Sequence, residues 1–491
     1  MHTRRDQVQA HLFTLSRVTA GLIRAEPDAA ETPMQRFTLG AVAGTAVGAL
    51  ALGGLMAFGF ISPGITNNFK KQGTIVLEKE TGTRYVFLDG ALHPVLNHTS
   101  AILISGKAPN QSRGGVLRGN QGITSVSSKS LKDVPKGPPV GIVGAPDFLP
   151  EAKRLDRGSW SVCSASVRQP DGTDKKTVTA YLGGAGEGVT ELNDKQTMLV
   201  KGDDGTSYLS WLDRKLKVSS QAALIGLGYG DATAFGVKDS WLNSLPSGSD
   251  LKGLDVPGRG TAGPPIGGRA TVVGQVYRDP GGETFLLMAD GLSPLTQTEA
   301  ALVLADPESQ KAYPGGQVVP LELATSAVAA APRSARDPKL TGFPQVLPEA
   351  IANGATGVRV PCYRILPGAG DNGTAALRAA FRETPPDSVT KGLPGVARPV
   401  PPGGLVADRV VVPPGSGMLV REEAPVGEAA PKLYLITDVG QKFQLSTPEL
   451  ARKLGYDETK AVPMPAGVLA LVPNGPVLDE AAARTPLAAN P

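Results

Sequence analysis

The sequence predicts a multi-domain α+β protein with one N-terminal transmembrane helix. After this helix we expect an elongated extracytoplasmic body, in which four α+β repeats surround a β-rich, discontinuous central domain. Three observations predict this fold: an apolar run at residues 37–61, a strand-rich pattern that recurs four times, and the composition. The chain has 61 glycines, 43 prolines and 5% aromatic residues, which favours strands and turns over a helical bundle.

The run 37–61 contains no charged residue and is long enough to cross a bilayer, because about 20 helical residues span a hydrocarbon core of about 30 Å. A cleaved signal peptide is the alternative. Its apolar region would have about 7–15 residues and would end at a small-residue cleavage site, which Ser62-Pro63-Gly64 does not resemble. We therefore predict a retained anchor.

Residues 1–36 are predicted to be a cytosolic amphipathic tail, with one helix over residues 6–24. The basic Arg5 precedes a stripe of apolar residues at spacings of three and four: Val8, Leu12, Leu15, Val18 and Leu22. Such a helix lies on an anionic leaflet or docks on a cytosolic partner. We expect docking, because anionic lipid would repel the acidic link Glu26–Glu31.

Basic residues set the predicted orientation. Lys70 and Lys71 flank the far end of the anchor, but five arginines lie on its N-terminal side: Arg4, Arg5, Arg17, Arg24 and Arg36. This bias favours a cytosolic N-terminus, and we expect a single-pass protein of the plasma membrane with its large C-terminal body outside the cytosol.

Small residues recur within the anchor, where Gly40, Gly44 and Gly48 are spaced by four. Such a face lets a second membrane helix approach closely. Glycine is also common in membrane helices in general, so both interpretations stay open.

Both cysteines, Cys163 and Cys362, follow the anchor and lack the spacing of a metal site or a Cys-x-x-Cys motif. In an oxidising compartment they would pair and close a long loop, which contributes roughly 4–5 kcal/mol in the chain-entropy model. Two buried free thiols are the alternative. We predict the disulfide.

Each repeat consists of two β-rich runs around a turn, then an aspartate, then a polar link into an apolar segment. Helices are predicted after this link at Asn97–Ile104, Thr296–Leu304 and from Ser446. An aspartate at a strand end could bind metal, but no second ligand recurs with it. We therefore interpret these residues as turn formers: Asp89, Asp213, Asp290 and Asp438.

The repeats divide the chain into nine predicted segments. A disulfide between the two cysteines would join the two halves of the central domain around an insertion. The segments are the tail 1–36, the anchor 37–61, repeat 1 at 62–130, the first half of the central domain at 131–195, repeat 2 at 196–255, repeat 3 at 256–318, the second half of the central domain at 319–415, repeat 4 at 416–484 and a C-terminal tail at 485–491.

Motifs for phosphate binding are incomplete. The segment Ala101–Ala108, with Lys107, approaches a P-loop but lacks its first glycine and its hydroxyl, and its apolar interior indicates core. Gly-x-Gly-x-x-Gly occurs at Gly258 among prolines, and again at Gly368 before residues 374–383, which look helical. Pro367 precedes the second motif and no acidic ribose ligand follows, so we interpret both as loops.

Other catalytic motifs are missing from the sequence. His93 and His98 do not have the spacing of a zinc site, and no Gly-x-Ser-x-Gly occurs. The net charge of +4 comes without a basic stripe interleaved with aromatics, which excludes a nucleic-acid-binding class. We expect no enzyme, no cofactor and no metal.

The order of these segments resembles the EccB family, bitopic core components of actinobacterial type VII (ESX) secretion systems. The tail Arg4-Arg-Asp-Gln-Val-Gln-Ala-His11 is the most specific match, and the ending Asn474-Gly-Pro-Val-Leu-Asp479 supports it. The resemblance covers essentially the full length of the chain.

This resemblance implies assembly with the EccC ATPase and the membrane subunits EccD and EccE, contact with the mycosin protease, and self-association in a ring-like assembly. The expected function is a structural core subunit that organises the extracytoplasmic side of the channel and docks partners. Some family members are labelled ATPases, and a weak nucleotide hydrolase is one alternative. An anchored cell-wall-binding protein is the other, for which the available tryptophans are Trp160, Trp211 and Trp241.

Overall fold

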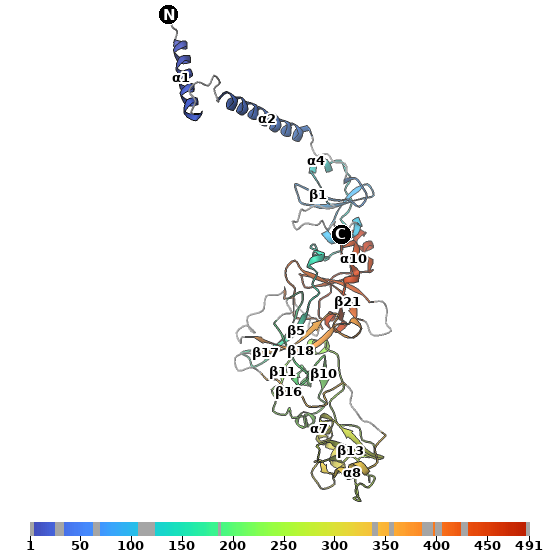
Figure 1. Ribbon diagram of the computed structural model, residues 1–491. Helices are drawn as coiled ribbons and strands as arrows, with labels where there is room; N and C mark the ends of the chain where they lie inside the picture. The colour runs from blue at the N-terminus through green and yellow to red at the C-terminus, as the bar shows by residue number, and fades with distance from the viewer. Residues whose placement is uncertain are drawn as a thin grey trace.

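The computed structural model describes residues 4–24, 34–61, 69–106, 123–184, 188–335, 342–352, 358–384, 396–397, 405–423 and 431–487. Two helices, α1 (Arg4–Arg24) and α2 (Met34–Ile61), precede an elongated body (Figure 1). Within α2, the span Phe37–Met56 is long and apolar enough to cross a membrane, and it is the one such span among the residues described. The predicted α+β fold with a single N-terminal apolar helix is confirmed.

Four sheets of the body share one topology, 3-2-1-4, in which a three-stranded antiparallel meander is followed by a helix and a strand parallel to the first. We call these units repeats 1 to 4. Repeat 1 contains β1 (Ile75–Glu78), β2 (Arg84–Leu88), β3 (Ala91–Pro94), α3 (His98–Ser105) and β4 (Ile123–Val126).

The other three repeats have the same elements in the same order. Repeat 2 contains β8 (Gln196–Lys201), β9 (Ser207–Trp211), β10 (Arg214–Lys217), α5 (Gln221–Gly226) and β11 (Phe235–Gly236); β16 (Glu349–Ala350) adds to β8. Repeat 3 contains β12 (Val276–Arg278), β13 (Thr284–Met288), β14 (Gly291–Leu295), α7 (Gln297–Ala305) and β15 (Leu321–Glu322). Repeat 4 contains β21 (Gly417–Glu423), β22 (Leu433–Thr437), β23 (Lys442–Gln444), α10 (Glu449–Lys453) and β24 (Val462–Pro465).

The first two strands of each repeat correspond to the predicted hairpin, but the sequence did not predict the third and fourth strands. The polar link after each aspartate forms the third strand. In repeat 3, the fourth strand β15 lies beyond position 318, where we predicted that this segment ends. The nine-segment division therefore remains a proposal in its boundaries.

Side-chain caps explain where two of the helices begin. Asn97 caps α3 by accepting a hydrogen bond from the Ser100 amide, and Thr296 forms a capping box with the buried Glu299 at the start of α7. In repeat 4, α10 begins at Glu449 after Pro448, later than the predicted start at Ser446.

A seven-stranded central sheet has the order β19-β20-β6-β5-β17-β18-β7. In the middle of this sheet, β5 pairs antiparallel with β17. Strand β5 comes before repeat 2 in the chain and β17 comes after repeat 3, so the central domain is discontinuous as predicted. The strands are β5 (Trp160–Arg168), β6 (Asp174–Tyr181), β7 (Thr190–Glu191), β17 (Val358–Leu366), β18 (Ala376–Thr384), β19 (Val396–Ala397) and β20 (Arg409–Val411).

The prediction that residues 374–383 look helical is wrong. The segment Ala376–Thr384 is the strand β18, which pairs along its whole length with β17. Its alanines and leucine favour a helix in isolation, but burial of Leu377 and Ala379 against the central core overrides that preference.

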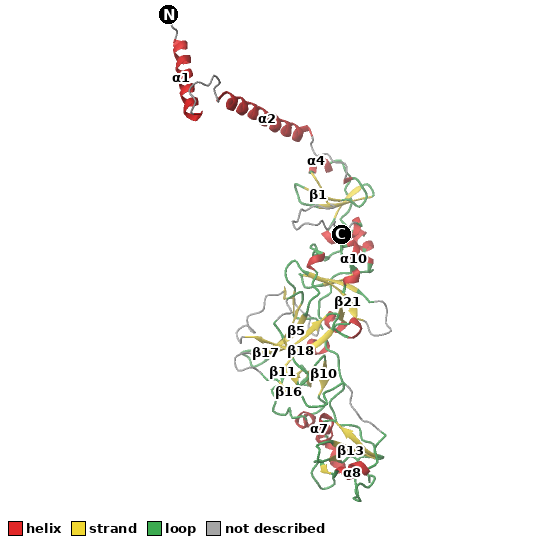
Figure 2. Cartoon of the chain, viewed as in Figure 1, coloured by secondary structure: helices red, strands yellow, loops and turns green. Residues whose placement is uncertain are grey.

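The units follow one another along the body in the order repeat 1, repeat 4, central sheet, repeat 2, repeat 3 (Figure 2), and hydrophobic clusters join them. One cluster joins Leu103 of repeat 1 to Phe443 of repeat 4, and the largest joins the central sheet to repeats 2 and 4. A third brings Leu302 of repeat 3 into the core of repeat 2.

The remaining described α-helices are short: α4 (Ser128–Leu131), α6 (Asp239–Asn243), α8 (Thr325–Ala330), α11 (Ala466–Ala470) and α12 (Glu480–Arg484).

Repeats 2 and 3 meet through a close contact of α5 with α7. A Cβ atom added to Gly226, the last residue of α5, would collide with the Cβ of Ala305 and lie 3.1 Å from the carbonyl oxygen of Ala301. Both alanines belong to α7. The small residues therefore set the separation of the two helices.

We expect Gly226→Val to lower the stability of the body by about 1–3 kcal/mol, because overpacking forces the two helices apart. The thermal unfolding midpoint and amide hydrogen exchange in α7 measure this effect. Gly316→Val is the matched control, since a Cβ at Gly316 would meet nothing within 4 Å. Equal midpoints for the two variants would contradict the proposed role of this contact.

Candidate interaction surfaces

The described residues hold no group of three or more His, Cys, Asp or Glu side chains that could bind a metal ion. The Nδ1 atom of His93 lies 2.9 Å from the carbonyl oxygen of Pro138. Burial and the neighbouring Arg84 lower the pKa of His98, which follows the cap of α3. Both histidines therefore lie in structural settings within repeat 1.

The phosphate-binding motifs lie in ordinary secondary structure. Residues Ala101–Ile104 are buried in α3, while Lys107 and Ala108 lie outside the described residues. The second glycine motif lies in the connection between β17 and β18, which includes a short 3-10 turn at Asp371–Gly373 and leads into a strand. Over their described residues, neither motif provides a cradle of backbone amides at a helix N-terminus.

The four aligned aspartates all lie in the turn between the second and third strands, at its first position in repeats 1 and 4 and at its second in repeats 2 and 3, and they have different partners. Asp89 adopts φ 51° and accepts a hydrogen bond from Gln72, whereas Asp213 pairs with the adjacent Arg214. Asp290 accepts from the Ser334 hydroxyl and the Ala335 amide, and Asp438 from the Gly415 amide. These local bonds are those of turn residues rather than of a recurring binding site.

Lys442 is a buried cation in repeat 4. Burial lowers the pKa of its ammonium group to about 8, and its Nζ atom donates to the carbonyl oxygen of Leu469 at 2.5 Å. Its backbone N–H donates to the carbonyl oxygen of Pro473, and its own carbonyl oxygen accepts from the Gly475 amide. The residue thus fixes the C-terminal segment to β23.

A disulfide joins Cys163 and Cys362, which lie opposite each other on β5 and β17 with Cα atoms 4.0 Å apart. The two residues are separated by 199 positions, so the bond closes a loop that contains repeats 2 and 3. Tyr181, Val360 and Ala380 surround it in a small buried cluster.

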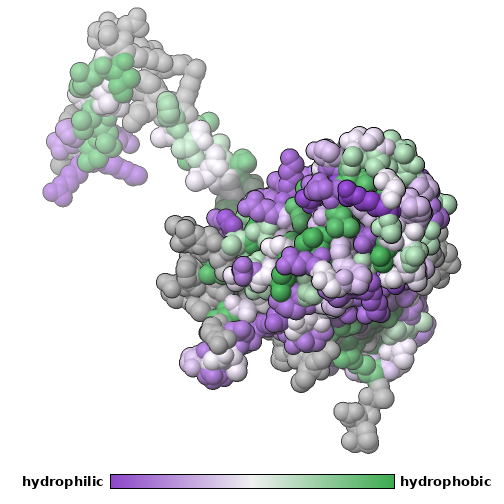
Figure 3. Space-filling model, turned by 90° about the horizontal axis from the view of Figure 1, so that it is seen from below, coloured by the Kyte–Doolittle hydropathy of each residue, from purple (hydrophilic) through white to green (hydrophobic). Residues whose placement is uncertain are grey.

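The apolar stripe of α1 has no cover in the described structure. Five side chains are each at least half exposed: Val8, Leu12, Leu15, Val18 and Leu22. Figure 3 shows the exposed apolar and hydrophilic residues of this helix together. In α2, a Cβ at Gly40, Gly44 or Gly48 would meet nothing within 4 Å, so this face is open to another helix.

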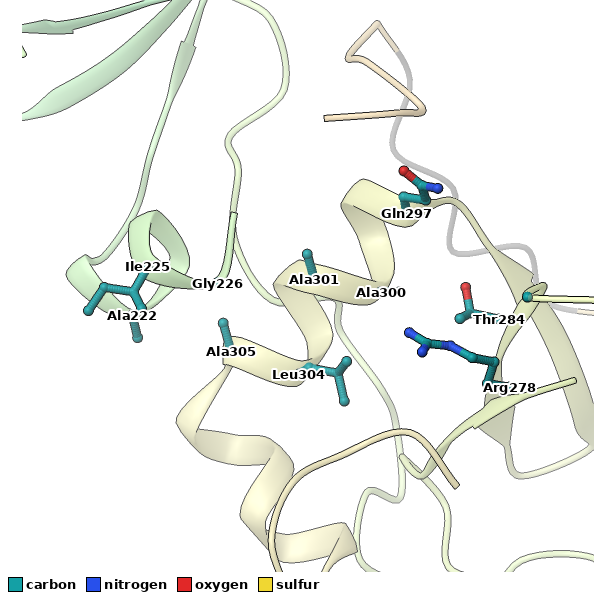
Figure 4. A pocket seen from close by; sticks show the side chains of 11 residues that line it. Ala222, Ile225, Gly226, Arg278, Thr284, Gln297, Ala300, Ala301, Leu304 and Ala305 are labelled. Carbon is teal, nitrogen blue, oxygen red and sulfur yellow. The ribbon is translucent and has the colours of Figure 1, made fainter. Parts of the chain in front are cut away.

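A groove of about 780 Å³ runs beside the contact of α5 with α7 (Figure 4). Alanines of both helices form one side of its wall, and Arg278, Thr284 and Gln297 contribute the polar side. The groove therefore lies between repeats 2 and 3 and is lined mainly by small residues.

The tryptophans offer little surface for stacking on a sugar. Trp160 and Trp241 are fully buried in the central cluster. The indole of Trp211 donates to the carbonyl oxygen of Asp194 at 2.8 Å. These positions disfavour a polysaccharide-binding surface built on tryptophan.

Comparison with known proteins gives one consistent result. The family profile "Type VII secretion system ESX-1, transport TM domain B" matches residues 1–489. The chain is 28% identical to the "ESX-2 secretion system ATPase EccB2" of Mycobacterium tuberculosis, over 98% of this chain and 94% of the relative.

Two solved structures have a similar fold. One is a chain of an intact ESX-5 inner membrane complex, with a TM-score of 0.62 and 24% identity over 100% of this chain and 96% of that one. The other is an EccB3 dimer from the ESX-3 core complex, with a TM-score of 0.62 and 22% identity over 84% of this chain and 100% of that one.

We expect iodoacetamide to label neither cysteine in the purified protein unless a reductant is added first, and labelling of both without reduction would rule the bond out.

Replacing both Cys163 and Cys362 by serine should lower the free energy of unfolding by about 2–5 kcal/mol, because the unfolded chain gains loop entropy. Chemical denaturation measures this change, with the reduced wild-type protein as the control.

Proposed function

This chain belongs to the EccB family of type VII secretion systems, and on this basis we propose that it is a structural subunit that organises the extracytoplasmic side of the secretion channel. The family and its place in an ESX inner membrane complex follow from the full-length match. The finer role, which includes the organisation of the channel and the docking of partners, is our proposal.

The continuity of the hydrophobic cores carries this proposal. Each repeat shares a buried cluster with a neighbour, so force applied at one end of the body is transmitted through packed side chains to the other. The body is attached to the membrane through the single helix α2. A stiff, elongated and anchored body is suited to holding other subunits at fixed distances from the membrane.

We propose that the body lies outside the cytosol and the N-terminal helix inside it. Two observations support this topology: the arginine-rich N-terminal side of α2 and the buried disulfide, which persists in oxidising compartments.

For the partners, we propose that α1 docks on the cytosolic region of EccC or EccD, and that α2 packs through Gly40, Gly44 and Gly48 against a membrane helix of the assembly. Contact with EccE and with the mycosin protease, and self-association in a ring-like assembly, complete the proposal. Exposed apolar side chains on α1 and the open glycine face of α2 support the first two contacts. The relative with a solved dimer supports self-association.

We do not assign the ATPase activity that the relatives' names carry. The candidate P-loop segment is a buried helix over its described residues, and the glycine motif at Gly368 is a strand connection. Phosphoryl transfer needs a phosphate cradle with positioned cations, and the described residues do not supply one.

We expect Leu15→Glu to reduce co-purification of this chain with EccC and EccD about tenfold, because a buried carboxylate without a partner opposes docking of the α1 stripe. Ala10→Glu is the matched control, since it adds the same charge at an exposed position away from the stripe. Deletion of residues 1–30 should have at least the effect of Leu15→Glu. A truncated protein that inserts and co-purifies at the wild-type yield would contradict docking.

We also expect the purified full-length chain to release no phosphate from ATP above the background of a mock purification, because the residues around Lys107 do not match a P-loop. A coupled phosphate-release assay measures the rate. Turnover that disappears in a Lys107→Ala variant would overturn this expectation.

A further inference from the structure

Repeat 1 carries a lysine-lined pocket of about 430 Å³, and none of the described contacts between the units of the body uses it. We call it the lysine pocket. Its wall consists of Glu78, Ser128, Lys129, Leu131, Lys132 and Lys136. All three lysines are exposed, and among the described residues none of them forms an ion pair.

Two acidic groups nearby, Glu78 and Glu80, are hydrogen-bonded to other residues, and the exposed Asp133 follows Lys132 in the chain. The carboxylate of Glu78 accepts hydrogen bonds from the hydroxyls of Thr81 at 2.6 Å and Tyr85 at 3.2 Å. Glu80 accepts from the amide and the hydroxyl of Ser128. Three lysines and one glutamate line the pocket, so its lining carries an excess of positive charge.

The repeat 1 sheet places this pocket on the side away from the rest of the body. Successive residues of β2 point to opposite faces: Val86 and Leu88 join the cluster shared with repeat 4, whereas Tyr85 and Phe87 join a separate cluster. The separate cluster includes Leu131, which lies between Lys129 and Lys132 in the chain. Lys136 extends over the Tyr85 ring, with Nζ 5.5 Å from the ring centroid.

The same cluster is where the chain from the membrane enters the body. Phe69, the first described residue after α2, is 1% exposed and packs with Leu131 and Val134. Residues 62–68 separate it from Ile61, so even a fully extended connection reaches at most about 28 Å. Figure 1 shows α4 at the end of the body beside α2.

From these positions we propose that the lysine pocket docks on phosphate headgroups of anionic phospholipids in the leaflet from which α2 emerges. The short connection keeps the three lysines within reach of that leaflet, and each cation close to an anionic surface is attracted to it. Lipid docking gives the body a second attachment to the membrane beside α2. Two attachments fix the tilt of the elongated body, which a single attachment leaves free.

The full-length chain can be tested in lipid nanodiscs of phosphatidylcholine alone and of phosphatidylcholine mixed with phosphatidylglycerol. Brief acetylation of amines, read by mass spectrometry, reports how accessible each lysine is. We expect at least about threefold less labelling of Lys129, Lys132 and Lys136 in the anionic discs, and a return to full labelling at about 1 M salt, where the Debye length is about 3 Å. Lys201 and Lys252 of repeat 2 serve as internal references.

Two results would overturn the proposal. One is equal labelling of the pocket lysines in both kinds of disc. The other is equal protection by inorganic phosphate in phosphatidylcholine discs, which would make the pocket a site for free anions rather than for lipid.

A charge reversal tests the pocket itself. In Lys132→Glu, protection of Lys129 and Lys136 in anionic discs should fall to the level in neutral discs. The matched control Lys201→Glu adds the same charge change in repeat 2 and should leave the protection intact. Unchanged protection in Lys132→Glu would also overturn the proposal.

Discussion

Every unit of the body is attached, directly or through a neighbour, to the pair of strands β5 and β17 in the middle of the central sheet. The residues that face each other there, Cys163 and Cys362, are 199 positions apart. Closing so long a loop costs chain entropy, and this cost arises before the contacts between the two strands can offset it. The disulfide removes much of that cost from the unfolded state, and α6, which follows the last strand of repeat 2, adds to the junction. Trp241 of α6 donates to the carbonyl oxygen of Val162 on β5 and lies 5.7 Å, between ring centroids, from Tyr363 on β17.

The four repeats then use one topology for two kinds of contact. Repeats 1 and 4 share a core through α3, α10 and α12, with Arg484 donating to the carbonyl oxygen of Ile104, whereas repeats 2 and 3 share one through α5 and α7. Helices on one face of a small sheet leave an apolar stripe that a neighbouring repeat can cover. One repeat of each pair, repeat 4 or repeat 2, also shares a buried cluster with the central sheet. The body is therefore long but keeps a continuous core. This arrangement is the physical basis for a structural role.

Chemistry and architecture both support the proposed structural role. The charged residues that recur in the repeats belong to turns, and the buried Lys442 holds the C-terminal segment in place. Three surfaces that the described residues leave uncovered belong to the N-terminal helices and to repeat 1: the α1 stripe, the glycine face of α2 and the lysine pocket. This distribution fits the role that we propose, and membership of a family of membrane-bound secretion systems agrees with it.

Local signals in the sequence were enough to specify several elements. A long uncharged run specifies α2, spacing of three and four specifies α1, and the capping residues Asn97 and Thr296 start α3 and α7. The four hairpins followed from turn chemistry and alternation. Other strands exist only through their partners: β11 and β15 have two residues each, too few to show a period, and β18 would favour a helix without β17. The sequence did not predict the lysine pocket either. Its lysines follow β4, while Tyr85 and Glu78 come from strands about 50 residues earlier. Pairing and burial between distant segments provide this information, and no local window of sequence contains it.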